Sequence, residues 1–301
     1  MYIAISMGDW YNTKRNIPLE EQIRKALWSK EQVRQKIREG KCPERQIIME
    51  NSKAKDQKVL QTVRSQKEMY VIFSECTKMP YVVCDPKTYD DEILIYFNVD
   101  ECKNKVRQLM NEKIPVKIVK IENRSFLEFY VSLYPMGVNE IVYDLGLPKE
   151  IRIQLADLVT RKNDGKMPNG QERIENSEFQ LTALYYMQEA RRLPQEKVLE
   201  SEELRELSEE MMAHFQKGKY FVVSKEGKEM VILKQKDGKV FQPIFTDVQE
   251  LGKFLSVHRK EKLQTGIVEA GKLIEILVPG AEGVAVNPFG INLQMKMQKK
   301  Q

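Results

Sequence analysis

The chain has 301 residues, of which 49 are basic and 44 are acidic, so its formal net charge is +5. This length allows two domains with cores of their own, and 42% hydrophobic with 31% charged residues is typical of a soluble globular protein. So small a basic excess argues against a dedicated nucleic-acid binder, which usually gathers its basic residues on one face. The sequence has no run of about 18 apolar residues, so no transmembrane helix is expected.

The cysteines and the first residues bear on the compartment. Cys42, Cys76, Cys84 and Cys102 form no Cys-x-x-Cys pair, so they predict neither a zinc site nor a redox dithiol. We interpret them as reduced thiols, which are usual in the cytoplasm. The start of the chain lacks a basic region and soon reaches Asp9, so no signal peptide is expected. The sequence therefore predicts a cytoplasmic protein.

Residues 1–52 form a predicted N-terminal extension that is partly helical. Pro18 is suited to the first turn of a helix, and Gly40 is suited to end it. One side of this helix is apolar and much of the rest is basic. Two interpretations stay open: the extension docks on the chain by its apolar side, or it binds an acidic partner. Under the second, the candidate partner-binding residues are the two tryptophans and three arginines, Trp10, Trp28, Arg24, Arg34 and Arg38.

Residues 53–158 and 201–301 contain matching segments in the same order, which predicts an internal duplication. Each unit begins with a helical pattern and continues with short strands rich in β-branched and aromatic residues. A helix, a strand, a Pro and a Gly-Val pair follow in both. The matched segments are Tyr70–Ser74 with Tyr220–Ser224, Leu133–Pro135 with Leu277–Pro279, and Gly137-Val138 with Gly283-Val284.

A strand runs into a helix at the centre of each unit. Asn98 and Thr246 are residue types that cap helix N-termini. Glu101 and Gln249 follow three residues later, which is the spacing of a capping box. We therefore predict that Asn98 and Thr246 are the N-caps of two equivalent helices.

Residues 159–200 separate the units and contain a polar loop followed by a helix. Ser177 and Gln180 have the spacing of a third capping box, with Ser177 as the predicted N-cap. The helix is apolar on more than one side, so we expect it to be buried between the units and to fix their angle. The predicted fold class is α/β (α+β), with two tandem mixed-sheet domains, a helical linker and a helical N-terminal extension.

The order of these elements resembles the SseB N-terminal domain, named after the enhanced serine sensitivity protein. The second unit carries the motifs of that family in Gln242–Asp247, Pro279, Gly283-Val284 and Asn287-Pro288. The first unit carries Tyr96–Asn98, Pro135 and Gly137-Val138, with Tyr143-Asp144 where the family usually has Asn-Pro. The resemblance covers two tandem SseB-like copies. It implies an α/β domain of bacterial cytoplasmic proteins with no established biochemical activity.

Few residues are candidates for chemistry. His214 and His258 have no cysteine near them in sequence, and we interpret both as ordinary surface or boundary side chains. The sequence contains no nucleophile elbow and no glycine-rich phosphate loop, so we expect no catalytic residue, no metal and no cofactor. Asp90-Asp91-Glu92 could hold a hard cation, but its place before a strand favours a solvated turn.

Three functions stay open. The sequence favours a non-catalytic adaptor or interaction module, because it has the caps and turns of a scaffold and lacks a catalytic motif. A nucleic-acid binder is the alternative, and it would need basic residues on one face with aromatic residues between them. An enzyme with a site between the units is third, since pockets often lie between domains. We expect an unidentified protein partner and no membrane.

Overall fold

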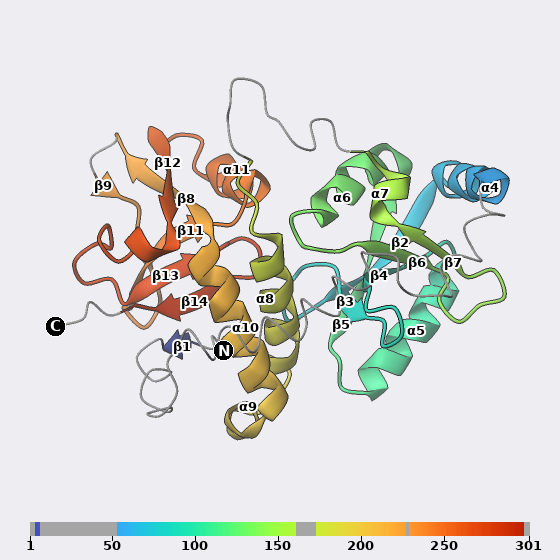
Figure 1. The fold of residues 1–301 in the computed structure, drawn as a ribbon, viewed down its shortest axis with the longest axis horizontal. Coiled ribbons are helices and arrows are strands. Elements are labelled where there is room, and N and C mark those ends of the chain that lie inside the picture. The colour runs from blue at the N-terminus through green and yellow to red at the C-terminus, as the bar shows by residue number, and fades with distance from the viewer. Residues whose placement is uncertain (1–3, 7–52, 161–172, 227–228, 298–301) are drawn as a thin grey trace.

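The computed structural model describes residues 4–6, 53–160, 173–226 and 229–297. Within them the chain forms two mixed sheets with helices packed against each (Figure 1), which confirms the predicted α/β class. Outside the described residues lie the predicted N-terminal helix and its candidate partner-binding residues, Trp10, Trp28, Arg24, Arg34 and Arg38.

The first unit contains the strands β2 (Glu68–Ser74), β3 (Val82–Cys84), β4 (Asp91–Tyr96), β5 (Val116–Glu122), β6 (Glu140–Tyr143) and β7 (Ile151–Gln154). Their order in the sheet is β5-β2-β4-β6-β7, and β3 also pairs with β4. β4 and β6 are parallel, whereas the other neighbouring strands are antiparallel. Every residue of β4 is buried, as expected for a central strand that is covered on both faces.

The second unit contains the strands β1 (Ala4–Ser6), β8 (Lys219–Lys225), β9 (Glu229–Met230), β10 (Leu233–Lys234), β11 (Val240–Phe245), β12 (Leu263–Glu269), β13 (Gly283–Val286) and β14 (Leu293–Lys296). Their order is β1-β14-β13-β11-β8-β12, with β9 on β8 and β10 on β11. β11 and β13 are parallel, and so are β1 and β14.

The helices are α4 (Lys53–Arg64), α5 (Val99–Asn111), α6 (Phe126–Leu133), α7 (Leu155–Leu158), α8 (Ser177–Ala190), α9 (Gln195–Glu200), α10 (Glu202–Lys217) and α11 (Val248–Val257), with short 3-10 turns η1 (Asn123–Ser125) and η3 (Ala270–Lys272). The paired helices α8 and α10 lie between the two sheets (Figure 1). One hydrophobic cluster includes side chains from both sheets and from these two helices, so the core continues from one unit into the other.

The two sheets share one strand order. β5, β2, β4, β6 and β7 of the first unit correspond to β12, β8, β11, β13 and β14 of the second. Their parallel and antiparallel pairings also agree. α5 follows β4 as α11 follows β11. This agreement is what an internal duplication predicts.

The N-cap of α11 differs from the prediction. Asn98 caps α5 as predicted, since its side chain accepts hydrogen bonds from the N–H groups two and three residues later. The cap of α11 is Asp247, which accepts the corresponding two bonds at 2.8 and 3.0 Å. Thr246 is buried instead, and its hydroxyl donates to Gln180 Oε1 at 2.6 Å. The prediction for Thr246 is wrong because its hydroxyl bonds to Gln180 and Asp247 and its N–H bonds to Asn287, so Asp247 is left to cap the helix.

Two turn residues show how the units correspond beyond the caps. Asp144 and Asn287 have positive φ angles, of 53° and 47°. Each side chain accepts the N–H that follows a central strand, from Phe97 and from Thr246, and both distances are 3.0 Å. Asp144 therefore does in the first unit what the Asn of the Asn-Pro pair does in the second.

The predicted match of Gly137 with Gly283 is out of register. Gly137 corresponds to Gly280, because both lie just before the parallel strand and have φ angles of 82° and 86°. Gly283 corresponds to Glu140, the first residue of β6. A side chain at Gly283 would place its Cβ 2.0 Å from the carbonyl oxygen of Met295. The sequence comparison therefore paired two glycines with different requirements: Gly137 has a positive φ angle, and Gly283 has no room for a side chain.

α8 joins the two units, as predicted for the linker helix. The Gln188 side chain accepts from the Val82 N–H at 3.0 Å and donates to the Val82 carbonyl at 2.9 Å, so it pairs with β3 like a neighbouring strand. Arg191, just after the helix, donates to the carbonyl of Cys76 at 2.6 Å and to that of Asn292 at 2.9 Å. These bonds reach both sheets, and they orient the units through buried polar groups that must be satisfied.

The predicted N-cap of α8 is wrong by one residue. Asn176 holds the N-cap position, and Ser177 is the first residue of the helix. The Asn176 side chain does not cap the helix, because its amide donates to the carbonyls of Lys219 and Thr246, both at 2.7 Å. Asn176 therefore bonds to the second unit and does not cap its own helix.

We expect Asn98→Ala and Asp247→Ala each to lower the free energy of unfolding by about 1 kcal/mol, because each removes an N-cap. Urea unfolding followed by circular dichroism measures the effect. Gln108→Ala, an exposed change later in α5, is the control and should leave the midpoint nearly unchanged. Equal midpoints for Asn98→Ala and Gln108→Ala would contradict the capping role.

Candidate functional site

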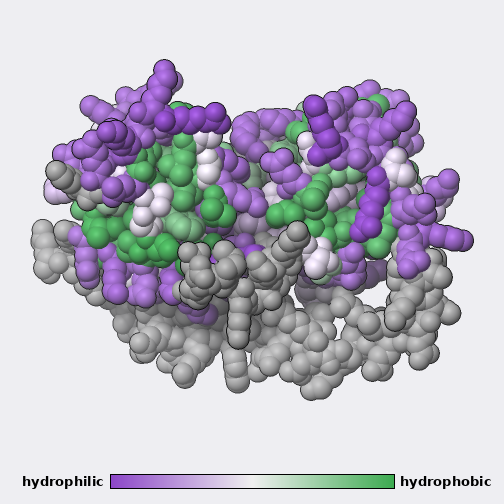
Figure 2. Space-filling view, turned by 90° about the horizontal axis from the view of Figure 1, so that it is seen from above, coloured by the Kyte–Doolittle hydropathy of each residue, from purple (hydrophilic) through white to green (hydrophobic). Residues whose placement is uncertain are grey.

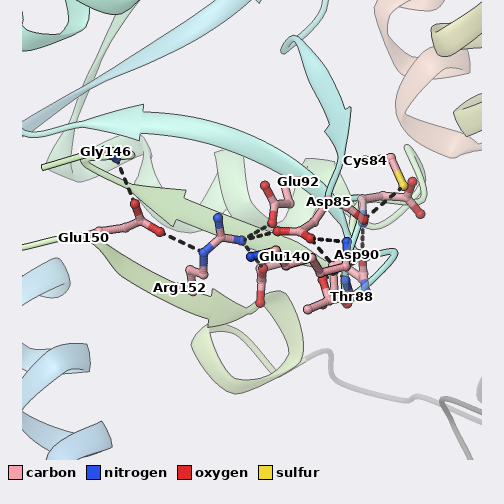
Figure 3. Close-up of polar contacts among 12 residues, drawn as sticks. Cys84, Asp85, Thr88, Asp90, Glu92, Glu140, Gly146, Glu150 and Arg152 are labelled. Atoms are coloured by element: carbon pink, nitrogen blue, oxygen red, sulfur yellow. Dashed lines mark hydrogen bonds and ion pairs between the residues drawn. The ribbon is translucent and has the colours of Figure 1, made fainter. Parts of the chain in front are cut away.

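Arg152 lies among four carboxylates of the first unit, two from the neighbouring strands β4 and β6 and two from turns (Figure 3). Its Nη1 is 3.1 Å from Asp85 and 3.3 Å from Glu140, and it also pairs with Glu92. Its Nε donates to Glu150 at 2.8 Å. Glu92 and Glu140 face each other across the parallel pair β4 and β6, so Arg152 on β7 neutralises acids that strand pairing has placed together.

The protonation of this cluster is unusual. Burial and the neighbouring Glu140 both raise the pKa of Glu92, Arg152 lowers it by less, and the net result is a pKa of about 7. Backbone hydrogen bonds hold the pKa values of Asp85 and Glu150 below their usual range. Glu92 therefore binds or releases a proton near neutral pH, while the two outer carboxylates stay ionised.

The acidic run at the start of β4 is buried, and Asp91 and Glu92 belong to the strand, so the predicted solvated turn is wrong. Asp90, Asp91 and Glu92 expose 5%, 7% and 3% of their surfaces. Asn139 donates to Asp90 and accepts from the Asp91 N–H, while the Tyr185 hydroxyl on α8 donates to Asp91 at 2.8 Å. The described residues contain no group of three ligand side chains placed to hold a metal ion. These contacts give the run a structural role in joining β4 to β6 and to α8.

A groove of about 650 Å³ opens between β3, α8 and α10, and we call it the junction groove. Its apolar and aromatic lining includes Tyr81, Val82, Tyr89, Leu181, Tyr185 and Leu207. Among the residues that the structure describes, no lysine or arginine lines the groove. Five carboxylates line it: Asp91, Glu178, Glu189, Glu203 and Glu210. The lining of the junction groove therefore combines apolar and aromatic side chains with an acidic charge.

His214 lies beside the junction groove and is 9% exposed, so of the two positions that the sequence left open, surface or boundary, it is not at the surface. Its Nδ1 is 3.2 Å from Glu178 and its Nε2 is 3.6 Å from Glu210. Burial alone lowers the pKa of His214, but the two carboxylates together outweigh burial and raise the pKa above its usual value. His258 is partly exposed, stacks on Phe254 and lies elsewhere, on the helix that follows β11.

A second groove, of about 1170 Å³, lies between α6 of the first unit and α11, β8 and β12 of the second. We call it the upper groove, because these elements lie along the top in Figure 1. Leu127, Val248 and Ile267 line it and are 65%, 64% and 53% exposed. Figure 2, seen from above, shows apolar surface over both units with polar residues around it. So much exposed apolar area in one groove is typical of an interaction site.

The candidate partner-binding residues of the N-terminal extension stay a prediction, because they lie outside the described residues. The residues of both grooves were missed by sequence reasoning. Leu127 and Val248 carry a weak signal, since each is apolar at the start of a helix and falls off the inward stripe. Among the described helices, none is long and apolar enough to cross a membrane.

No family model matches the chain, and neither does any curated protein. Two solved structures are similar to it, each with 12% sequence identity and a TM-score of 0.19. One is Tic22 from Plasmodium falciparum, which covers 72% of this chain and 85% of its own. The other is Tic22 from Anabaena, described as a protein of protein transport, which covers 73% of this chain and 84% of its own. Structures with so low a TM-score need not share a fold, so this similarity supports no function for the chain.

We expect Glu92→Gln to flatten the dependence of stability on pH near neutrality. Glu92 has a pKa of about 7 in the folded protein against 4.5 normally, so the folded state binds the proton more tightly. Its contribution to stability is full below its usual pKa and is lost as pH rises through about 7. Thermal melting on either side of neutrality should show a drop for the unchanged protein and a smaller drop for Glu92→Gln.

Glu150→Gln is the matched control, because Glu150 also bonds to Arg152 but has a lowered pKa. Its stability should change at acidic pH, and the drop through neutrality should persist. If Glu92→Gln and Glu150→Gln gave the same profile through neutrality, Glu92 would not be the group that titrates there.

Proposed function

We propose that the protein is a non-catalytic adaptor that binds a protein partner in the upper groove. The observation that carries this proposal is the exposure of Leu127, Val248 and Ile267 in one groove built from both units. Apolar side chains that are surrounded by polar ones form the centre of many protein interfaces. A partner that covers them removes their apolar area from water, which favours association.

The edge of the second sheet supports an extended segment as the occupant. β12 is the last strand in the sheet order, and within the described residues it pairs with β8 alone. Ile267 on this strand also lines the upper groove. A partner segment with alternating apolar residues could pair with β12 and place its side chains in the groove, as in β-strand addition. We propose this as the mode of binding.

The charges of the upper groove favour a protein over a nucleic acid. Its three basic residues are accompanied by three acidic ones, so the lining offers no stripe of positive charge for phosphates. These residues are Arg173, Lys219 and Lys272 with Glu175, Glu269 and Glu275.

We further propose that both units are SseB-like and that the protein works in the cytoplasm. The common strand order and the matched roles of Asp144 and Asn287 support the first proposal. Cys76 and Cys102 form no disulfide within the described residues, which supports the second proposal, because reduced cysteines are usual in that compartment.

We expect Val248→Asp to abolish partner capture, because a charge in the apolar groove would have to be desolvated on binding. Affinity purification of the tagged full-length chain from the cells that express it, followed by quantitative mass spectrometry, measures capture. Val257→Asp is the matched control: Val257 lies on the same helix with the same 64% exposure but outside the upper groove. Both variants should melt like the unchanged protein. Equal capture by Val248→Asp and Val257→Asp would remove the upper groove as the binding surface.

A further inference from the structure

We infer that the junction groove is a second binding site, which takes a basic amphipathic helix from a protein partner. It lies on elements that the upper groove does not use, namely β3, α8 and α10. The inference therefore goes beyond the proposed function and stands or falls separately from it.

The first argument is charge. The protein as a whole has a net charge of +5, yet the Asp, Glu, Lys and Arg side chains that line the junction groove are all carboxylates. They come from three different elements. Glu178 and Glu203 lie at its rim, where Glu178 has a 61% exposed side chain and Glu203 is also exposed. Within the described residues, Glu203 forms no ion pair. A groove with this lining attracts cations and repels acidic segments.

The second argument is the apolar part of the lining. Leu181 and Leu207 face the groove from α8 and α10, and the rings of Tyr89 and Tyr185 lie at its side. A free metal ion or a small polyamine would leave this apolar area exposed to water. A ligand that covers the apolar lining and also reaches Glu178 and Glu203 must carry apolar and cationic groups together. Lysine and arginine side chains suit the rim, since their apolar stems can lie along the aromatic rings.

The third argument is the length of the groove. Its lining residues on α8 run from Glu178 to Glu189, which is about 17 Å of helix at about 1.5 Å per residue. This length matches about three turns of a partner helix laid beside α8. An amphipathic helix meets such a groove with apolar residues spaced three and four apart, which is a common mode of recognition. The partner helix would place its apolar stripe on Leu181 and Leu207 and its basic residues at Glu178 and Glu203.

The test uses the full-length protein and three synthetic peptides of about five helical turns. The first has a leucine stripe flanked by lysine and arginine, the second has the same stripe flanked by glutamate, and the third is a scrambled form of the first. Fluorescence anisotropy measures their binding at low and high salt. We expect the basic amphipathic peptide alone to bind, and its affinity to fall with salt because the rim contacts are between exposed charges.

Two charge reversals on α10 form the matched pair. Glu203→Lys should weaken binding of the basic peptide by about tenfold or more, because it removes an attraction and adds a repulsion. Glu206→Lys changes the same charge one turn away, on an exposed residue that does not line the groove, and should leave the affinity nearly unchanged. Thermal melts of both variants establish that they are folded.

Several outcomes would overturn the inference. Equal binding of the basic and acidic peptides would remove the charge argument, and equal affinities of Glu203→Lys and Glu206→Lys would place binding elsewhere. Failure of the basic peptide to bind the unchanged protein would also overturn it. The last outcome concerns Arg24, Arg34 and Arg38 of the extension. If the peptide bound only after these three were changed to glutamate, the groove would bind the chain's own basic segment and not a partner.

Discussion

The polar side chains of α8 hold the two sheets in one arrangement, and both grooves depend on that arrangement. Gln188 satisfies both backbone groups of Val82 in the first unit, and Gln180 accepts from Thr246 in the second. These groups are buried, so breaking any one contact would leave a polar atom without water or partner, which is costly. Apolar packing alone would allow α8 to slide, whereas paired hydrogen bonds fix its position along β3. The junction groove has α8 as a wall, and the upper groove needs α6 and β12 at a fixed spacing.

The parts of the fold that sequence could predict are those that local patterns determine. The order of strands and helices along the chain, the helix after each central strand and the Asn98 cap all follow from periodicity, turn residues and capping chemistry, which act within a few residues. The one-residue errors at Thr246 and Ser177 have a different origin. At each place a side chain or backbone group is held by a residue distant in sequence, Asn287 for Thr246 and the second unit for Asn176. Tertiary contacts there overruled the local rule.

The candidate sites were out of reach of sequence reasoning for a related reason. Three acids in a row before a strand normally indicate solvent, yet Asp91 and Glu92 are buried because Tyr185 and Arg152 reach them from distant elements. Val248 is exposed because none of the described elements packs over it, which local sequence does not reveal. An apolar residue in a helix is ordinarily assigned to the core, and only the packed structure shows which apolar residues have been left outside.

The acidic residues of this protein are used in two opposite ways, and this difference locates function better than net charge does. In the Arg152 cluster, Glu92 and Glu140 are buried and share Arg152, and burial together with Glu140 raises the pKa of Glu92, so these charges are already balanced within the fold. In the junction groove, Glu178 and Glu203 reach solvent beside apolar residues, so a partner can contact both carboxylates, although Glu178 also lies near His214. A composition of +5 suggests an acidic partner, whereas the position of the carboxylates suggests a basic one. Because charge acts over about 8 Å in physiological salt, the local arrangement of carboxylates decides which charged partner binds.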